Sequence, residues 1–248
     1  MSATIGSRVM VLDSVDSTMD EARRMGLNEE GAVIVARKQS NARGRLGRTW
    51  HSPVGGLWFT IVVIPKQSAT TSPLLSLAAS LAVARGITAA TGLPAAIRWP
   101  NDVYIHGGKV AGVLTELEVV GDVITRAFVG VGVNANFELD ELPEEIRSKT
   151  TTILRELGRG VSLDELLAKI LKEFNSIYET YKTGWHDEIL REVKENMELL
   201  GSPVVVTLTN GTLIGVLEDI DELGRIILRL DQDRIQLSPG DVERIAPA

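Results

Sequence analysis

The chain has 248 residues, a formal net charge of −7 at pH 7, 44% hydrophobic residues and no cysteine. Its length and composition are those of a soluble globular protein with one large domain, or a main domain and a small appendage. The absence of cysteine excludes disulfides, thiolate metal sites and a cysteine nucleophile. Because the net charge is negative, we expect the surface as a whole to repel nucleic acid and anionic membranes.

The sequence has no pattern typical of a membrane span, a leader peptide or a zinc site. No apolar run approaches the roughly 20 residues that cross a bilayer, and the opening segment lacks a charged region followed by an apolar one. The three histidines do not stand at metal-ligand spacing. We therefore expect a cytoplasmic protein that does not bind membranes.

Strand and helix patterns alternate at the start of the chain. Strands are predicted at 8–12 and 32–37, and a helix begins between them near Ser17, which forms a capping pattern with Asp20. The continuous apolar run at 57–64 predicts a strand buried on both faces. This alternation is typical of a sheet covered by helices.

The middle of the chain predicts one long helix followed by several strands. Ser72 and Pro73 supply the N-cap and first position of a helix that ends near Gly92. Strands follow at 97–99, 109–120 and 123–134, and Gly121-Asp122 joins the last two as a hairpin.

The last hundred residues change from helix to short strands. Ser162 and Glu165 form a capping box before an amphipathic helix, and a further helix is predicted at about 185–199. After Gly201, five short strands with turns between them predict a small β-barrel. The pattern as a whole predicts an α+β fold, in which a mixed sheet flanked by helices precedes a small C-terminal barrel.

The most unusual segment is a basic, glycine-containing loop in an acidic protein. The segment from Arg37 to Gly56 contains five basic residues, Arg37 included, and no acid. Glycine at 44 and 47 allows the backbone to approach a ligand, and arginine forks match phosphate or carboxylate oxygens. From charge alone, a solvated basic hairpin and an RNA-binding tract remain alternatives.

The segment ARGRLGRTW at 42–50, followed by SPVGGLWFT, resembles the signature of the biotin–protein ligases, whose GRGRxGRxW loop folds over biotin and biotinyl-adenylate. The resemblance continues in the family's order, and it covers nearly the whole chain. Its further motifs are DSTM (16–19), KQ (38–39), RWPND (98–102), GKVAGVLTE (108–116) and GVGVN (130–134). It implies a class II synthetase-like catalytic domain at 1–200 and an SH3-like barrel at 201–248.

The resemblance also assigns roles to individual residues. The implied catalytic residues are Lys109 and Arg45. The implied biotin-binding residues are Ser17, Thr18, Met19, Gln39, Arg43, Gly44, Arg45, Lys109 and Gly112. The implied ATP-binding residues are Arg45, Arg48, Trp50, Asn101, Asp102, Lys109 and Asn134, with the Mg²⁺ of Mg–ATP near Asp102 and no dedicated protein metal site.

Two positions depart from the family pattern. Met19 stands where asparagine is common, and Ala42 stands where glycine is usual. Met19 removes one polar contact to the ligand, and Ala42 makes the loop less free to adopt positive φ.

Structural alternatives stand beside several of these roles. Ser17 and Thr18 can cap a helix, and Gln39 can lie on the surface at a strand end. Lys109 can be a surface lysine at a strand edge, and Asn101-Asp102 can form an Asx turn. Neither a GxxxxGK[ST] phosphate loop nor a GxGxxG loop is present.

We expect an ATP-dependent ligase that forms biotinyl-5′-AMP and transfers biotin to a lysine of a biotin carboxyl carrier domain. A lipoate–protein ligase and a biotin-responsive regulator are the alternatives. The arginine loop and its tryptophan disfavour the first, and the early strand pattern leaves no room for a DNA-binding domain, which disfavours the second. The sequence leaves the oligomeric state open, with a homodimer among the possible states.

Overall fold

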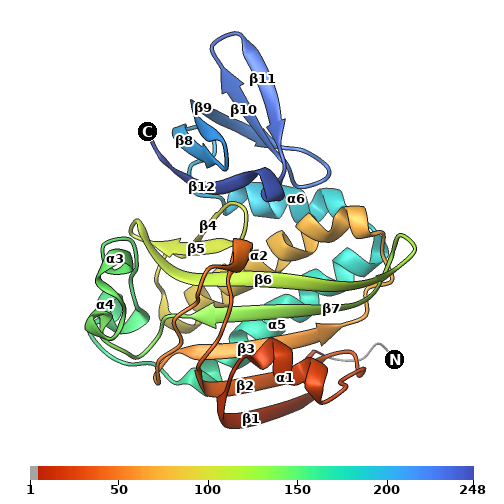
Figure 1. The fold of residues 1–248 in the computed structure, drawn as a ribbon, viewed down its shortest axis with the longest axis vertical. Helices are drawn as coiled ribbons and strands as arrows, with labels where there is room; N and C mark the ends of the chain where they lie inside the picture. The colour runs from red at the N-terminus through yellow and green to blue at the C-terminus, as the bar shows by residue number, and fades with distance from the viewer. Residues whose placement is uncertain (1–4) are drawn as a thin grey trace.

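A seven-stranded mixed sheet forms the centre of the larger part of the molecule (Figure 1). The computed structural model describes residues 5–248. The first four residues of the opening segment, for which no leader peptide is predicted, lie outside the described residues. The strand order is β1-β2-β3-β7-β6-β5-β4, in which β1 and β2 run parallel and all other neighbours are antiparallel. The strands are β1 Arg8–Val15, β2 Ala32–Gln39, β3 Leu57–Val63, β4 Ala96–Arg98, β5 Asp102–Ile105, β6 Gly108–Val120 and β7 Val123–Val133. The predicted mixed sheet is confirmed.

Helices cover both faces of this sheet. α2 (Ser72–Thr91) and α5 (Leu163–Thr183) pack on one face and share its main hydrophobic core, whereas α1 (Thr18–Arg24) covers the other face over a smaller core (Figure 1). The helical stretch Ala69–Thr91, which includes α2, is long and apolar enough to cross a membrane by length and composition. However, 67% of its apolar 18-residue segment is buried inside the protein. Its apolar character is therefore explained by its place between sheet and α5.

The helix ends follow local sequence rules, with one correction. Ser17 caps α1 by accepting the backbone N–H groups of Met19 and Asp20, as the capping pattern predicts. The prediction of Ser72 as the N-cap of α2 was wrong by one position: Ser72 is already helical and Thr71 precedes it. Gly92 ends α2 with φ of 77°, a left-handed conformation that favours glycine.

The C-terminal residues form a second sheet of five antiparallel strands, which confirms the predicted small β module. Its order is β11-β10-β9-β8-β12. The strands are β8 Pro203–Leu208, β9 Gly211–Ile220, β10 Ile226–Leu230, β11 Asp233–Leu237 and β12 Val242–Pro247. α6 (His186–Glu195) precedes this module and ends four residues before the predicted helix end. The module lies next to the strands β4 and β5 of the large sheet (Figure 1).

Among the strands and α-helices of residues 5–248, three short elements were not predicted by the sequence patterns. They are β5, whose four residues are too few for a clear alternation, and the helices α3 (Glu144–Arg147) and α4 (Ile153–Leu157). The segment between these helices runs beside the start of β6, where Lys109 N–H donates to Lys149 O at 2.9 Å and Thr151 N–H donates to Lys109 O at 3.0 Å. These contacts fix the backbone of Lys109 at the start of β6.

Candidate active site

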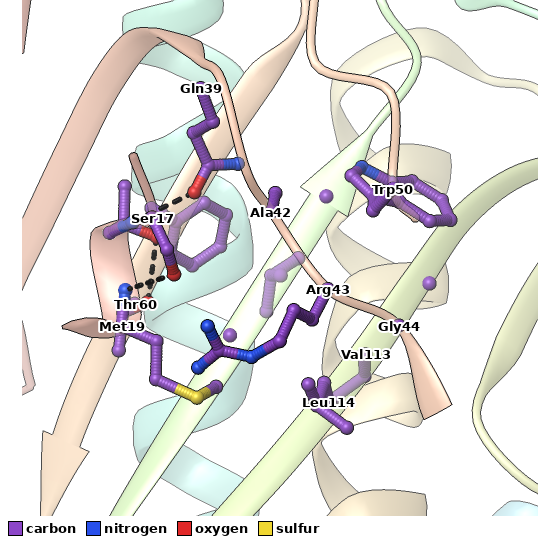
Figure 2. Close-up of a pocket in the computed structure, with 16 residues that line it drawn as sticks. Ser17, Met19, Gln39, Ala42, Arg43, Gly44, Trp50, Thr60, Val113 and Leu114 are labelled. Carbon is purple, nitrogen blue, oxygen red and sulfur yellow. Dashed lines mark hydrogen bonds between the residues drawn. The ribbon is translucent and has the colours of Figure 1, made fainter. Parts of the chain in front are cut away.

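A pocket lies between the start of α1, the loop after β2 and the middle of strands β3, β7 and β6 (Figure 2). We name residues 41–50 the arginine loop. The pocket lining combines predicted site residues with others outside that set. Among the latter are Thr60, which sequence reasoning missed, and Gly130 and Gly132 of the GVGVN motif. The lining residues are Ser17, Thr18, Met19, Gln39, Ala42, Arg43, Gly44, Trp50, Phe59, Thr60, Gly112, Val113, Leu114, Gly130, Val131 and Gly132.

One end of the pocket is polar and tightly hydrogen-bonded. The Thr18 and Thr60 hydroxyl oxygens lie 2.8 Å apart, and Gln39 Oε1 accepts the Thr18 N–H at 2.8 Å (Figure 2). Gln39 Nε2 in turn donates to Ser52 Oγ at 3.0 Å. Ser17 and Thr18 therefore take part in the helix start and line the pocket at the same time. Thr60 is the lone polar residue of an otherwise apolar strand, and that exception in the sequence could have identified it.

The floor of the pocket is made by glycines on neighbouring strands. Gly112 of β6 pairs with Gly132 of β7, and Trp50 lies across both of them. A Cβ on Gly132 would overlap the Trp50 indole, and a Cβ on Gly130 would come within 2.8 Å of Met19 Cε. Met19 is thus buried against Gly130 and makes no polar contact through its side chain. Among residues 5–248, the buried Trp50 Nε1 has no hydrogen-bond partner, so it is available to an acceptor on a ligand.

A cation and a carboxylate meet beside Trp50 at the edge of this pocket. Lys109 Nζ lies 2.7 Å from Asp102 Oδ1 and 5.0 Å from the centre of the Trp50 ring. Both charged side chains are about three quarters buried, with exposed fractions of 27% for Lys109 and 24% for Asp102. This arrangement places a positive charge, a negative charge and an aromatic face around Gly112.

The arginine loop is a small hairpin whose ends are closed by backbone hydrogen bonds. Gly44 N–H donates to Arg48 O at 2.7 Å, and Trp50 N–H donates to Ala42 O at 2.9 Å. Arg43 extends from this hairpin toward Met19 (Figure 2) and forms two hydrogen bonds with the Asp20 carboxylate. The hydrogen bond from Arg43 holds the pKa of the Asp20 carboxyl below its usual range.

The tip of the arginine loop contacts the C-terminal module instead of the pocket. Arg45 donates to the backbone oxygens of Pro239 and Val242, the latter at 2.8 Å, and Arg48 Nη2 pairs with Glu243 at 3.2 Å. Burial lowers the pKa of the Arg45 guanidinium, which still remains protonated at neutral pH. Arg45 Nη1 also lies 3.4 Å from Asn101 Oδ1, which connects the loop tip to the RWPND turn.

Two predicted asparagines are buried and hold the backbone near Lys109. Asn101 Nδ2 donates to Val113 O at 2.5 Å. Asn134 Nδ2 donates to Lys109 O at 3.3 Å, and Asn134 N–H donates to Val110 O at 2.8 Å. In this structure both asparagines therefore support the strand that carries Lys109.

The predicted site residues thus form three neighbouring groups. One group surrounds the pocket: Ser17, Thr18, Met19, Gln39, Arg43, Gly44, Trp50 and Gly112. A second joins Lys109 to Asp102 and Asn134. A third, Arg45 and Arg48 with Asn101, faces the C-terminal module. Within residues 5–248, no group of three or more His, Asp or Glu side chains could hold a metal ion.

Comparison with known proteins gives matches over both parts of the chain. Residues 11–134 match the biotin/lipoate A/B protein ligase family, and residues 199–244 match the biotin protein ligase C-terminal domain. The bifunctional ligase/repressor BirA of Bacillus spizizenii is 31% identical over 243 residues, which cover 96% of this chain and 74% of that protein. The biotin–[acetyl-CoA-carboxylase] ligase of Paracoccus denitrificans is 32% identical over 88% of this chain and 93% of its own length.

The fold is likewise that of a solved ligase. The structure of the Aquifex aeolicus biotin protein ligase in complex with biotin and ATP superposes with a TM-score of 0.85 and 30% identity, covering 98% of this chain and all of that one. Fold and site together define an α+β enzyme of the ligase class. The chain belongs to the biotin–protein ligase family, and the lipoate-ligase and regulator alternatives are not favoured.

Proposed function

We propose that this pocket binds biotin and that the chain activates biotin with ATP. In the first step, a biotin carboxylate oxygen attacks the α-phosphorus, the bond to the β-phosphate breaks, and pyrophosphate leaves. In the second step, a neutral lysine amine of a biotin carboxyl carrier domain attacks the acyl carbon of biotinyl-5′-AMP. AMP leaves, the amine loses a proton, and an amide bond forms.

The observation that carries this proposal is the contact of Lys109 with Asp102 beside the Trp50 ring. Two anions, a carboxylate and a phosphate, must approach each other in the first step. A partly buried ammonium at the edge of the pocket offsets their repulsion, because charges interact more strongly away from water. We therefore assign Lys109 to hold both anions, and Asp102 to keep the ammonium in place until they bind.

Trp50 and the arginine loop take the remaining roles in this proposal. The flat Trp50 ring, which lines the pocket, suits stacking against an adenine base. Arg45 reaches the phosphates when it leaves the carbonyl oxygens of the C-terminal module, and the closed loop keeps water from the mixed anhydride. Mg²⁺ enters as Mg–ATP, since this ion is commonly held by one or two carboxylates together with substrate phosphates, and Asp102 supplies one.

Further parts of the proposal concern location and partners. We place the domain boundary after residue 200, with the catalytic domain at 1–200 and the C-terminal module at 201–248. We place the protein in the cytoplasm, and we infer that it does not bind nucleic acid. In support, the arginines of the loop contact Asp20, Glu243 and backbone oxygens, so that their charges are compensated within the protein.

The decisive experiment measures pyrophosphate release from ATP with and without biotin. Biotin-dependent release is expected, and folded protein that releases none would exclude the proposal. Lipoate in place of biotin serves as the comparison substrate, and equal rates would favour a lipoate ligase. The transfer step is measured by the increase in mass of the carrier domain. A carrier domain whose acceptor lysine is replaced by arginine is the control.

A further inference from the structure

The family resemblance assigns no role to Asp20. This residue nevertheless makes the closest side-chain contact of residues 41–44, the part of the arginine loop that lies at the pocket. Its carboxylate accepts Nη1–H and Nη2–H of Arg43 at 2.6 and 2.7 Å. Asp20 lies in the first turn of α1, where its own N–H donates to Ser17 Oγ. The helix start that lines the pocket therefore also holds the loop above it.

Two further charged residues complete a network around this pair. Arg23 Nη2 lies 2.5 Å from Glu116 Oε2, and Arg43 Nη2 lies 3.7 Å from Glu116 Oε1. Arg23 also approaches Asp20 at 3.5 Å, and its guanidinium lies 4.5 Å above the Phe128 ring. Two cations and two anions from α1, β6 and the arginine loop thus compensate one another. Such bidentate networks contribute more than isolated surface ion pairs do.

This network determines what Arg43 can do in the pocket. Arg43 lines the pocket together with its neighbours Ala42 and Gly44, and its side chain reaches across to Met19 (Figure 2). Its charge is compensated by Asp20 and Glu116, so it is suited to cover a ligand and not to act as counter-ion for an anionic group. The loop therefore has two separate anchors: Arg43 on α1, and Arg45 with Arg48 on the C-terminal module.

We propose that Asp20 is a positioning residue, which fixes Arg43 across the pocket and keeps residues 41–44 closed over it before any ligand binds. The Arg45 anchor is released when phosphate binds, whereas the Asp20 anchor persists throughout the reaction. The identity of the retained ligand, biotin and then its adenylate, rests on the proposed function.

Amide hydrogen exchange of the ligand-free protein tests the anchor directly. The reporters are the Gly44 and Trp50 amides, whose hydrogen bonds close the hairpin. In Asp20→Asn, exchange of the peptide covering 41–50 should rise about fivefold, equivalent to about 1 kcal/mol. Glu21→Gln is the matched control, because Glu21 lies in the same turn and pairs with Arg24. The reciprocal pair Asp20→Arg with Arg43→Asp should restore slow exchange.

Unchanged exchange in Asp20→Asn, or an equal rise in Glu21→Gln, would overturn the proposal. So would a charge-swapped protein that, although folded, exchanges as fast as Asp20→Asn. These measurements need no substrate. They therefore test whether Asp20 anchors the loop even if the wild type released no pyrophosphate and the proposed function failed.

The kinetic consequence separates positioning from catalysis. Asp20→Asn should raise KM for biotin about fivefold and leave kcat for pyrophosphate release within about twofold, because Lys109 and Asp102 stay in place. Glu21→Gln should match the wild type in both parameters. A fall in kcat with unchanged KM would assign Asp20 to the chemical step and contradict the positioning role.

Discussion

Lys109 Nζ and Asp102 Oδ1 lie 2.7 Å apart although they come from different strands of the same sheet. β5 carries Asp102 and β6 carries Lys109, and Asp102 pairs in register with Gly112. The charged pair thus stands directly beside the glycine over which Trp50 lies. The geometry places the Lys109 ammonium beside Trp50 and the pocket floor, and it leads to the first prediction.

Lys109→Ala should reduce the rate of biotinyl-AMP formation by about 10²- to 10³-fold, the usual loss when one transition-state charge contact is removed. The fold should persist, because a shorter side chain leaves the backbone contacts of Lys109 with residues 149 and 151 intact. Biotin-dependent pyrophosphate release measures the effect, and circular dichroism checks the fold. Lys169→Ala, on the exposed face of α5, is the control. Near-normal turnover of Lys109→Ala would remove Lys109 from its assigned role.

Arg45→Ala should let biotinyl-AMP escape before transfer. Without its guanidinium the loop tip lacks the phosphate contact that replaces its hydrogen bonds to Pro239 and Val242 when the intermediate is bound, so water and free intermediate exchange more readily. Biotin should then appear on lysines of an added bystander protein, detected by mass spectrometry. Arg37→Ala, in the same basic segment but paired with Asp13 on the surface, should not leak. Tight retention of the intermediate by Arg45→Ala would contradict this role.

Most of the fold could be predicted from the sequence because its cues are local. Apolar runs, capping residues and turn glycines gave the order and type of every long element, and helix ends were wrong by at most a few residues. The four-residue β5 lacked such a cue. Its place is set by pairing with β6, a contact that no local pattern encodes.

The candidate site was likewise predictable from the sequence only in part. The motif residues around the pocket were identified by resemblance, and Thr60 could have been found as the one polar residue in a buried strand. The partners of the loop arginines could not be predicted from the sequence, because Asp20 precedes Arg43 by 23 positions and Val242 follows Arg45 by 197 positions. Only the folded chain brings these charges and carbonyl oxygens together.

Gly132→Ala should displace the Trp50 indole and raise KM for ATP about tenfold or more. The new methyl group would occupy the space of the ring, and the surrounding strands leave the backbone little freedom to move. Gly130→Ala is the matched variant on the same strand, where the added methyl meets the flexible end of Met19. It should raise KM for biotin more than KM for ATP. If both variants changed the two KM values equally, Trp50 and Met19 would not lie at different ends of the ligand.

The Asp20 anchor should also show a defined pH dependence. Its hydrogen bond with Arg43 lowers the pKa of Asp20 in the folded protein. A lowered pKa means that the anchor is fully present above the ordinary carboxyl value of about 4 and is lost as the pH falls through the lower, folded value. The exchange ratio of Asp20→Asn to wild type for residues 41–50 should therefore stay constant from about pH 5 to about pH 8. It should approach one only when the pH falls below the lowered pKa of Asp20 in the folded protein, where this carboxyl is protonated whether the loop is closed or open. A ratio that changed near neutral pH would assign loop closure to another titrating group.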